Sequence, residues 1–561
     1  MDKFLYISIT IVITSFLIII ILSNFKESFN KNTSKLNMIT SNQNIDKKLN
    51  KITDMLEDGK HIQNYFVIFV PYCDVYKDYI IECLESIKNQ TYQNFEIVFI
   101  NDGSKDFDFI IDFVKNNLKD KFKIIHYKEN NGPAFTKWMF INYLKKNYYN
   151  PNDIALIVDG DDSIQTNTLE ILNFRYNQTK CWTTFGEATG TFCQKSREIA
   201  NKDMDYKNMR SKKWCANHPR SFKIGLLQYF NENDFKYNNE WLKKCTDRSL
   251  IYDSLERSGN HKIQHINIVL YNYREHNNNS HKKVKNEYKQ KVLKHILKQP
   301  KKEEILDDIH IVMCCWKSIF NLEKQVRNLS DQTCKNNIHF HLLNNNRNNE
   351  NTLEEMIRTF TNNRIKIHLS HYDNKYYGFQ RFLYIKDILL KNYLLDYVVI
   401  IDDNQFFPNN WLENLWKMKY PQTYACWFGK NWYHTRDYWN SSIVSYTDLV
   451  KNLNKDIKKF HYGGTGGSII DTSIFNNKSL LWDIPNDLPP GVSVYNIDDL
   501  WLSFIMIYYY NWNIKRTFLT PIINSDDQVE EVALYKTLKD QKQKLMDYLI
   551  KKYKWLSSKQ N

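Results

Sequence analysis

Carboxylates crowd the chain at residues 159–162, where the sequence DGDD follows the apolar run IALIV. Neighbouring carboxylates repel one another, so a folded protein keeps several together mainly where a cation neutralises them. Oxygen ligands select Mg²⁺ or Mn²⁺, and such an ion would in turn bridge a diphosphate. An isolated Asp-x-Asp is more often an exposed turn, but the position after a predicted buried strand favours a metal site. We therefore predict that Asp159 and Asp161 bind a divalent metal and a diphosphate.

A second acidic pair, Asp402 and Asp403, follows the apolar run VVII in the same way. Asp402 lies 243 residues after Asp159, and Asn344 lies 243 residues after Asn101. Similar residues that recur at the same sequence separation, here 243 residues, indicate a duplicated domain. The second pair is therefore predicted to hold a second metal and diphosphate, although an asparagine replaces the third acid.

Short apolar runs alternate with amphipathic helical patterns, which is typical of an α/β fold with a mostly parallel sheet covered by helices. In such sheets ligands bind beyond the carboxyl ends of the strands, where these acidic residues are expected to lie. The predicted strands are 66–70, 95–100, 122–126 and 154–158, then 309–313, 338–343, 365–369 and 397–401. The predicted helices lie near 79–90, 107–118 and 134–146, then near 322–329, 353–360 and 379–391.

Four further stretches accompany the DGDD sequence in the first half, namely EIVFINDGS, ENNGPA, CTDRSLIYDSLE and LYNYREHNNNS. Together they resemble the family 2 glycosyltransferases of the GT-A fold over residues 64–281. The resemblance implies transfer of a sugar from a nucleotide-sugar donor, assisted by a metal and with inversion at the anomeric carbon. It implies a hexosyltransferase-like enzyme of class EC 2.4.

The resemblance also assigns roles to residues of the first half. By position, Asp102 would contact the base or ribose of the donor, and Asp162 would support the metal-binding loop. Asp247 matches the general base that takes the proton of the acceptor hydroxyl, although it could equally cap the helix that follows. Arg274 and His276 match a basic spot near the diphosphate.

One residue departs from the family pattern. Asp74 stands where the family usually has Asn. This difference leaves the choice of nucleotide open.

The second half, residues 305–525, resembles a more divergent GT-A glycosyltransferase through YYGFQRF, IIDDNQFFP, HYGGTGGSIIDTSIF and NIDDLWLSF. By position, Asp498 or Asp499 would be the base. Gly464 and Gly466 would let the backbone approach a sugar or phosphate closely. A distinct donor and a degenerate site are both compatible with this pattern.

An uncharged apolar stretch at residues 4–22 is long enough to cross a bilayer as a helix. It predicts a single-pass membrane protein. The count of flanking lysines favours a cytosolic body, whereas the usual layout of anchored enzymes favours a lumenal one, so the orientation stays open. The predicted segments are an anchor at 1–23, a polar stalk at 24–63, a basic linker at 282–304 with a solvated helix face, and an amphipathic C-terminal helix at 526–561.

Composition narrows the function classes. The chain has 561 residues, of which 42% are hydrophobic, so it is long enough for two large folded domains. The net charge of +14 is spread over lysines in linker-like segments, and no aromatic-basic motif accompanies it. A nucleic-acid partner is therefore not expected.

The observations together predict a membrane-anchored glycosyltransferase with two tandem GT-A domains. Its expected partners are a UDP- or GDP-sugar donor, Mn²⁺ or Mg²⁺, and a glycan or glycoprotein acceptor. Two alternatives remain open at this point. Either one domain is active and the other binds the acceptor, or both domains are degenerate and the protein only binds glycans.

Overall fold

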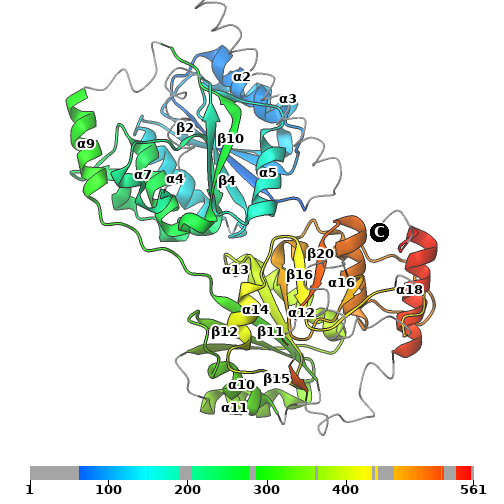
Figure 1. Ribbon diagram of the computed structural model, residues 1–561. Coiled ribbons are helices and arrows are strands. Elements are labelled where there is room, and N and C mark those ends of the chain that lie inside the picture. The colour runs from blue at the N-terminus through cyan, green and yellow to red at the C-terminus, as the bar shows by residue number, and fades with distance from the viewer. Residues whose placement is uncertain are drawn as a thin grey trace, which may run out of the picture. The chain divides into compact units, whose positions relative to one another are not determined.

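Two large mixed β-sheets, each accompanied by helices, form the described part of the computed structural model (Figure 1). We call the described residues between 62 and 298 the first lobe and those between 309 and 556 the second lobe. The structure describes residues 62–147, 149–189, 205–276, 286–316, 319, 321–360, 364–432, 436–439, 460–517, 519, 521–523 and 538–556.

The first lobe contains an eight-stranded sheet with the order β3-β2-β1-β4-β7-β6-β10-β5. β1 pairs in parallel with β2 and β4, whereas β7 is antiparallel to both of its neighbours. The strands are β1 Phe66–Tyr72, β2 Phe95–Asp102, β3 Phe122–Tyr127, β4 Ile154–Ile157, β5 Ser163–Ile164, β6 Thr183–Ala188, β7 Asn217–Lys223 and β10 Ile263–Asn272.

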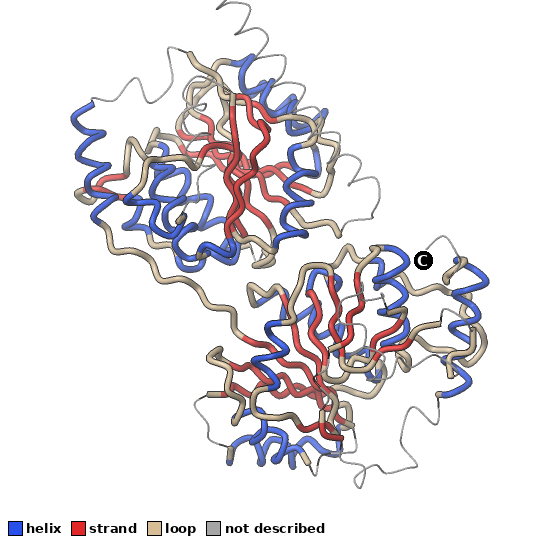
Figure 2. The backbone as a smooth tube through the Cα atoms, in the orientation of Figure 1, coloured by secondary structure: helices blue, strands red, loops and turns tan. Residues whose placement is uncertain are grey.

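Helices flank this sheet on both sides (Figure 2). Buried residues of α4, α7 and α9 join one core cluster with the sheet, for example Phe140, Leu255 and Ile296. The helices are α2 Lys77–Lys88, α3 Asp108–Asn117, α4 Pro133–Lys146, α5 Thr168–Thr179, α7 Thr246–Ser258 and α9 Asn286–Lys298. Strands buried on both faces need continuous apolar runs, which explains why β1 and β2 are readable in the sequence.

The second lobe contains a seven-stranded sheet with the order β13-β12-β11-β14-β19-β16-β20. As in the first lobe, its first four strands are parallel and its fifth, β19, is antiparallel to both neighbours. The two lobes therefore share one strand layout. The strands are β11 Ile309–Cys315, β12 Ile338–Asn344, β13 Ile365–His371, β14 Tyr397–Ile401, β16 Thr423–Cys426, β19 Ser468–Asp471 and β20 Asn513–Arg516.

The helices of the second lobe include one that continues through a π-helical turn at Ile385–Leu389. The C-terminal helix α18 joins the core through Leu545, Met546 and Leu549, so it packs onto this lobe. The helices are α10 Leu322–Ser330, α11 Glu350–Thr359, α12 Gln380–Tyr384, α13 Leu390–Asn392, α14 Trp411–Lys417, α16 Asp498–Phe504 and α18 Lys539–Tyr553.

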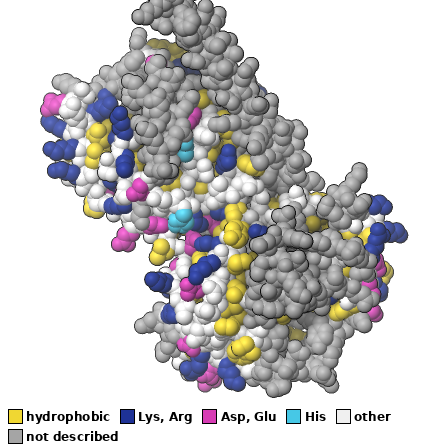
Figure 3. Space-filling view, viewed as in Figure 1, with side chains coloured by type: hydrophobic (Ala, Val, Ile, Leu, Met, Phe, Trp, Pro, Cys, Tyr) yellow, Lys and Arg dark blue, Asp and Glu magenta, His cyan; other side chains and the backbone are white. Residues whose placement is uncertain are grey.

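The predicted basic linker contains a helix that belongs to the first lobe. Val292 and Ile296 of α9 are buried, while its lysines Lys291 and Lys294 are exposed. Figure 3 shows Lys and Arg side chains gathered at the edge where Figure 1 places α9. The helix therefore covers part of the core with its apolar residues, while these two lysines face solvent.

The membrane prediction needs correction. Within the described ranges, no helix combines the length and apolar character needed to cross a bilayer. This finding contradicts the prediction of a single-pass membrane protein. The apolar stretch at 4–22, on which the prediction rested, lies outside the described residues, as does the polar stalk except for residues 62 and 63.

Candidate functional site

The carboxyl ends of β2, β4 and β10 lie at one edge of the first sheet, because these strands run in the same direction. Asp102 is the last residue of β2, and the DGDD sequence begins two residues after β4. Arg274 and His276 follow β10. The topology therefore brings most of the predicted donor-binding residues to the same edge.

Tyr271 holds the acidic loop in place. Its hydroxyl donates to Oδ2 of Asp162 at 2.8 Å and accepts the backbone N–H of Asp159 at 3.0 Å. The backbone N–H of Arg274 donates to the other oxygen of Asp162 at 2.7 Å. Burial, with Asp159 and Asp161 nearby, raises the pKa of Asp162 to about 8. Asp162 is thus a buried anchor between the loop and β10.

Asp161 faces the two residues that were predicted to form a basic spot. Its Oδ2 lies 2.9 Å from Nε2 of His276. Nε of Arg274 donates to the backbone oxygen of Asp161 at 3.0 Å, and the same guanidinium pairs with Glu82. A carboxylate and an imidazole nitrogen therefore meet at the point where a metal was predicted.

Asp159 keeps part of its side chain, 29%, accessible to solvent. Burial of much of the group, offset by Lys137 and reinforced by Asp247, raises its pKa to about 6. Its Oδ2 lies 3.6 Å from Nε2 of His218, an imidazole whose pKa burial holds well below the ordinary value. His218 is therefore neutral and leaves Asp159 without full charge compensation, as expected of a site that receives a cation.

Asp247 lies in the first turn of α7 and is held by two cations. Nη1 of Arg220 lies 2.9 Å from Oδ2, and Nζ of Lys137 lies 3.3 Å from Oδ1. Burial alone would raise the pKa of Asp247, but Arg220 and Lys137 bring it well below the ordinary value. The same Arg220 nitrogen lies 2.8 Å from His218, so Asp247 is connected to Asp159 through charged and polar contacts.

Asp102 is almost fully buried, with 2% of its surface exposed. Its two carboxylate oxygens accept the backbone N–H groups of Asn131 and Gly132 at 2.9 and 2.8 Å. The residue therefore holds the loop that leads into α4. Its predicted contact with the donor remains a prediction.

The sequence analysis missed Lys137, His218, Arg220 and Tyr271. His218 and Arg220 alternate along β7, and a polar pair at that spacing indicates a strand whose side chains point into a site. Tyr271 stands within the quoted stretch LYNYREHNNNS, but nothing local marks its hydroxyl as the partner of the acidic loop.

In the second lobe, Arg381 stands between two of the predicted acids. Its Nη1 lies 3.3 Å from Asp402, and its Nε lies 3.1 Å from Asp498. Burial raises the pKa of Asp498 to about 6 even though Arg381 opposes the shift. Burial, together with Asp402, raises the pKa of Asp403 to about 7. One guanidinium therefore already neutralises part of this acidic group.

A cavity of about 330 Å³ opens beside these residues. It brings together four predicted positions, Asp402, Gly464, Gly466 and Asp499. Residues that the sequence analysis did not place at the site complete the lining, among them Gln405, Trp427, Lys430, Tyr438, Tyr462 and Lys542.

On one side of this cavity, Asp499 forms an ion pair with Lys542 of the C-terminal helix α18. Asp499 accepts a hydrogen bond from the hydroxyl of Tyr462 and lies 3.3 Å from Nζ of Lys542. Burial, together with the nearby Lys542, lowers the pKa of Lys430 to about 8. The cavity therefore has a cationic side formed by two lysines and an acidic side formed by Asp402.

Gly466 is required by close packing. A Cβ built on Gly466 would overlap Oδ2 of Asp402 and crowd Nε2 of Gln405, 2.7 Å away. The adjacent Gly467 has a φ of +68°, which favours glycine. The predicted close approach of the glycine-rich loop is thus an approach to the side chain of Asp402.

Part of the first lobe is similar to known proteins. Residues 67–185 match the family model Glycosyl transferase family 2. Glycosyltransferase GlyG of Streptococcus pneumoniae is 35% identical over 94 residues, which cover 17% of this chain and 29% of that protein. The putative glycosyltransferase EpsH of Bacillus subtilis is 34% identical over 94 residues, covering 16% and 25%. The chain thus spans less than a third of the length of these relatives.

Two solved structures share lower identity. TarS of S. aureus in complex with UDP-GlcNAc is 19% identical, with a TM-score of 0.30, over 39% of this chain and 61% of that chain. A mannosyltransferase of Pyrobaculum calidifontis in complex with GDP-Man and Mn²⁺ is 16% identical, with a TM-score of 0.29, over 40% and 61%. The similarity to glycosyltransferases therefore rests on the family model and the two relatives, and not on these two structures.

Proposed function

We propose that the first lobe, whose residues 67–185 match the family model Glycosyl transferase family 2, transfers a sugar from a nucleotide-sugar donor to a glycan or glycoprotein. The observation that carries the proposal is the acidic loop after β4. Two partly exposed carboxylates, Asp159 and Asp161, stand there on a framework fixed by Asp162 and Tyr271. The expected donors are UDP- and GDP-sugars, with inversion at the anomeric carbon.

The donor set fits Mn²⁺ or Mg²⁺. Asp159 and Asp161 would hold the ion through carboxylate oxygens, and Nε2 of His276 lies close enough to Asp161 to contribute or to orient it. When bound, the metal would neutralise charge on the diphosphate leaving group. A neutral His218 and a raised pKa at Asp159 are consistent with a site that gains its positive charge from a ligand.

Asp247 is the proposed base for the acceptor hydroxyl. Its two cations make Asp247 a weak base, because a carboxylate of low pKa holds a proton poorly. A diphosphate bound at the acidic loop would compete with Asp247 for Arg220 and Lys137. We therefore expect donor binding to raise the proton affinity of Asp247 before transfer.

The experiment uses the full chain incubated with a panel of UDP- and GDP-sugars, with and without Mn²⁺. Nucleotide release is scored in the wild type, in Asp161→Asn and in Asp112→Asn. Asp112 lies exposed on α3 and controls for the loss of one acid elsewhere. Release that needs Mn²⁺, disappears in Asp161→Asn and persists in Asp112→Asn supports the proposal and identifies the donor.

Two results would contradict it. Equal release by the wild type and Asp161→Asn would place the chemistry elsewhere in the chain. A folded wild type that binds glycans but neither binds nor hydrolyses any donor would favour the glycan-binding alternative.

For the second lobe we propose a second sugar-transfer site. The supporting observation is the cavity that brings together Asp402, Asp499 and the loop of Gly464 and Gly466. Because Arg381 already pairs with Asp402, this site is expected to bind its donor with less help from a metal than the first site.

The variant Asp402→Asn distinguishes the two roles of this lobe. Loss of one product with the other unchanged indicates a second transferase. Unchanged products with a raised KM for the acceptor indicate that the lobe binds the acceptor instead.

A further inference from the structure

Four histidines form a row on one face of the second sheet. In the strand register His310 of β11 is opposite His339 of β12, and His341 of β12 is opposite His368 of β13. Successive residues of a strand point to opposite faces, so His339 and His341 share a face. His310, His339 and His341 are buried, with 1%, 5% and 1% of their surface exposed.

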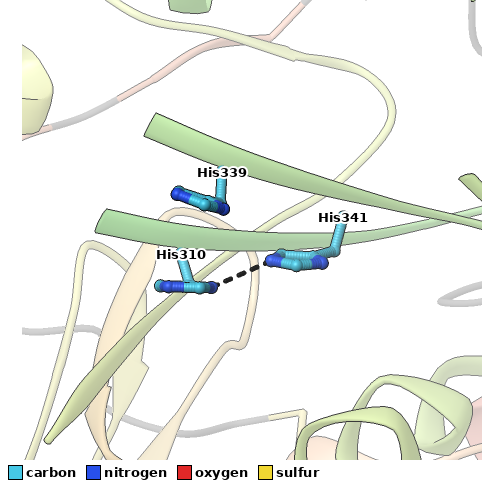
Figure 4. A group of neighbouring side chains, drawn as sticks. All are labelled: His310, His339 and His341. Atoms are coloured by element: carbon cyan, nitrogen blue, oxygen red, sulfur yellow. Dashed lines mark hydrogen bonds between the residues drawn. The ribbon is translucent and has the colours of Figure 1, made fainter. Parts of the chain in front are cut away.

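The ring nitrogens of these histidines lie close together, in rings that are nearly parallel. Figure 4 shows the imidazoles of His310, His339 and His341 grouped together, with His310 and His341 joined by a hydrogen bond. Nδ1 of His310 lies 3.0 Å from Nε2 of His341, and one potential ligand atom from each of the three residues lies within 4.8 Å of the others. Three nitrogens bound to one tetrahedral Zn²⁺ are separated by about 3.4 Å, since each Zn–N bond is about 2.0–2.1 Å.

The outer nitrogens have partners that suit metal ligands. Nε2 of His339 lies 3.4 Å from Oδ2 of Asp308, and Nδ1 of His341 lies 3.0 Å from the hydroxyl of Tyr384. A ligating histidine commonly uses its second ring nitrogen in this way, with a carboxylate or another polar group. Of the remaining nitrogens, Nε2 of His341 faces Nδ1 of His310, and Nδ1 of His339 faces Nε2 of His368.

A fourth imidazole lies beside these three. Nε2 of His368 lies 3.1 Å from Nδ1 of His339, and His368 stands opposite His341 in the strand register.

We propose that His310, His339 and His341 bind a structural Zn²⁺ ion that joins β11 to β12. Imidazole nitrogens are common zinc ligands, and His368 as a fourth ligand would close the site, as in structural zinc sites. The cluster lies near the starts of the strands, whereas Asp402 follows the end of the parallel strand β14. This site is therefore separate from the proposed donor sites and does not depend on the transferase assignment.

The competing explanation is a hydrogen-bonded row of neutral histidines without metal. To distinguish the two, the full chain is purified without a histidine tag and without chelator, and its metal content is measured by mass spectrometry. We expect about one zinc per chain, which is lost in His341→Asn and retained in His261→Asn. His261 is an exposed histidine of the first lobe and is the matched control.

Two further measurements keep the test independent of folding and of the acidic sites. The double variant Asp161→Asn/Asp402→Asn should keep its zinc. In the wild type, a strong chelator should lower the melting temperature, one equivalent of Zn²⁺ should restore it, and Co²⁺ should give the visible absorption of a tetrahedral site. A wild type that contains no zinc, takes up no Co²⁺ and melts identically with and without chelator would overturn the proposal.

Discussion

Replacing Tyr271 by Phe tests the framework of the first site with the smallest possible change. The substitution removes one hydroxyl from a residue that is fully buried. It removes a hydrogen bond of 2.8 Å to the carboxyl group of Asp162 and leaves the backbone N–H of Asp159 without its acceptor at 3.0 Å. No other contact of the ring needs to change.

The expected cost follows from these two hydrogen bonds. With a pKa of about 8, Asp162 is mostly protonated at neutral pH. A hydrogen bond between uncharged groups contributes about 0.5–1.5 kcal/mol, and a buried unsatisfied N–H costs about 1–3 kcal/mol. The two losses share one hydroxyl and so do not add in full, which gives a destabilisation of about 2 kcal/mol. For domains of this size, that corresponds to a fall in melting temperature of roughly 4–8 °C.

The assay is thermal unfolding of the wild type, Tyr271→Phe and Tyr229→Phe, followed by donor kinetics. Tyr229 is 43% exposed, so its variant should unfold within about 0.5 kcal/mol of the wild type. We also expect the KM for the donor to rise in Tyr271→Phe, because the loop that carries Asp159 and Asp161 is less firmly held. If Tyr271→Phe melts with the wild type and keeps its KM, the hydroxyl does not hold the loop and the reasoning is refuted.

Three other predictions concern single residues. Asp247→Asn should lower kcat about 10²–10⁴-fold with little change in the donor KM, and steady-state kinetics that show only a raised KM would exclude a proton-transfer role. Gly466→Ala should destabilise the second lobe by about 1–3 kcal/mol, because the added methyl overlaps Asp402; an unchanged urea midpoint would contradict this. Asp162, with a pKa raised from 3.8 to about 8, binds more protons folded than unfolded between those values, so its contribution to stability should be lost as the pH rises from about 4 to about 8. Urea unfolding of metal-free protein should show this decline flattened in Asp162→Asn, and equal slopes in both proteins would refute it.

The sequence predicted the central strands well because of how they are buried. β1, β2, β4 and β14 are covered on both faces, so they read as continuous apolar runs with clear ends. β7 was not anticipated, because NHPRSFK contains a proline and alternating polar residues. Those polar side chains are buried at the site, which removes the hydrophobic pattern that identifies an ordinary strand.

The acidic residues could be predicted, but their partners could not. A carboxylate after a strand is a local signal, whereas Arg381 meets Asp402 and Asp498 only through the tertiary fold. The same holds for the cations of Asp247, since Lys137 comes from α4 and Arg220 from β7. Because these partners could not be read from the sequence, Asp247 was predicted as a base with no ion pair, whereas the structure pairs it with Lys137 and Arg220.

Because Lys542 lies on the C-terminal helix α18, the two candidate sites are completed at different times during synthesis of the chain. Every residue of the first candidate site, from Asp102 to His276, is synthesised before β11. The second cavity has Lys430 but lacks Lys542 until α18 has been made and packs against Asp499. A prematurely terminated chain would therefore retain the complete first site but only an open, partly formed version of the second.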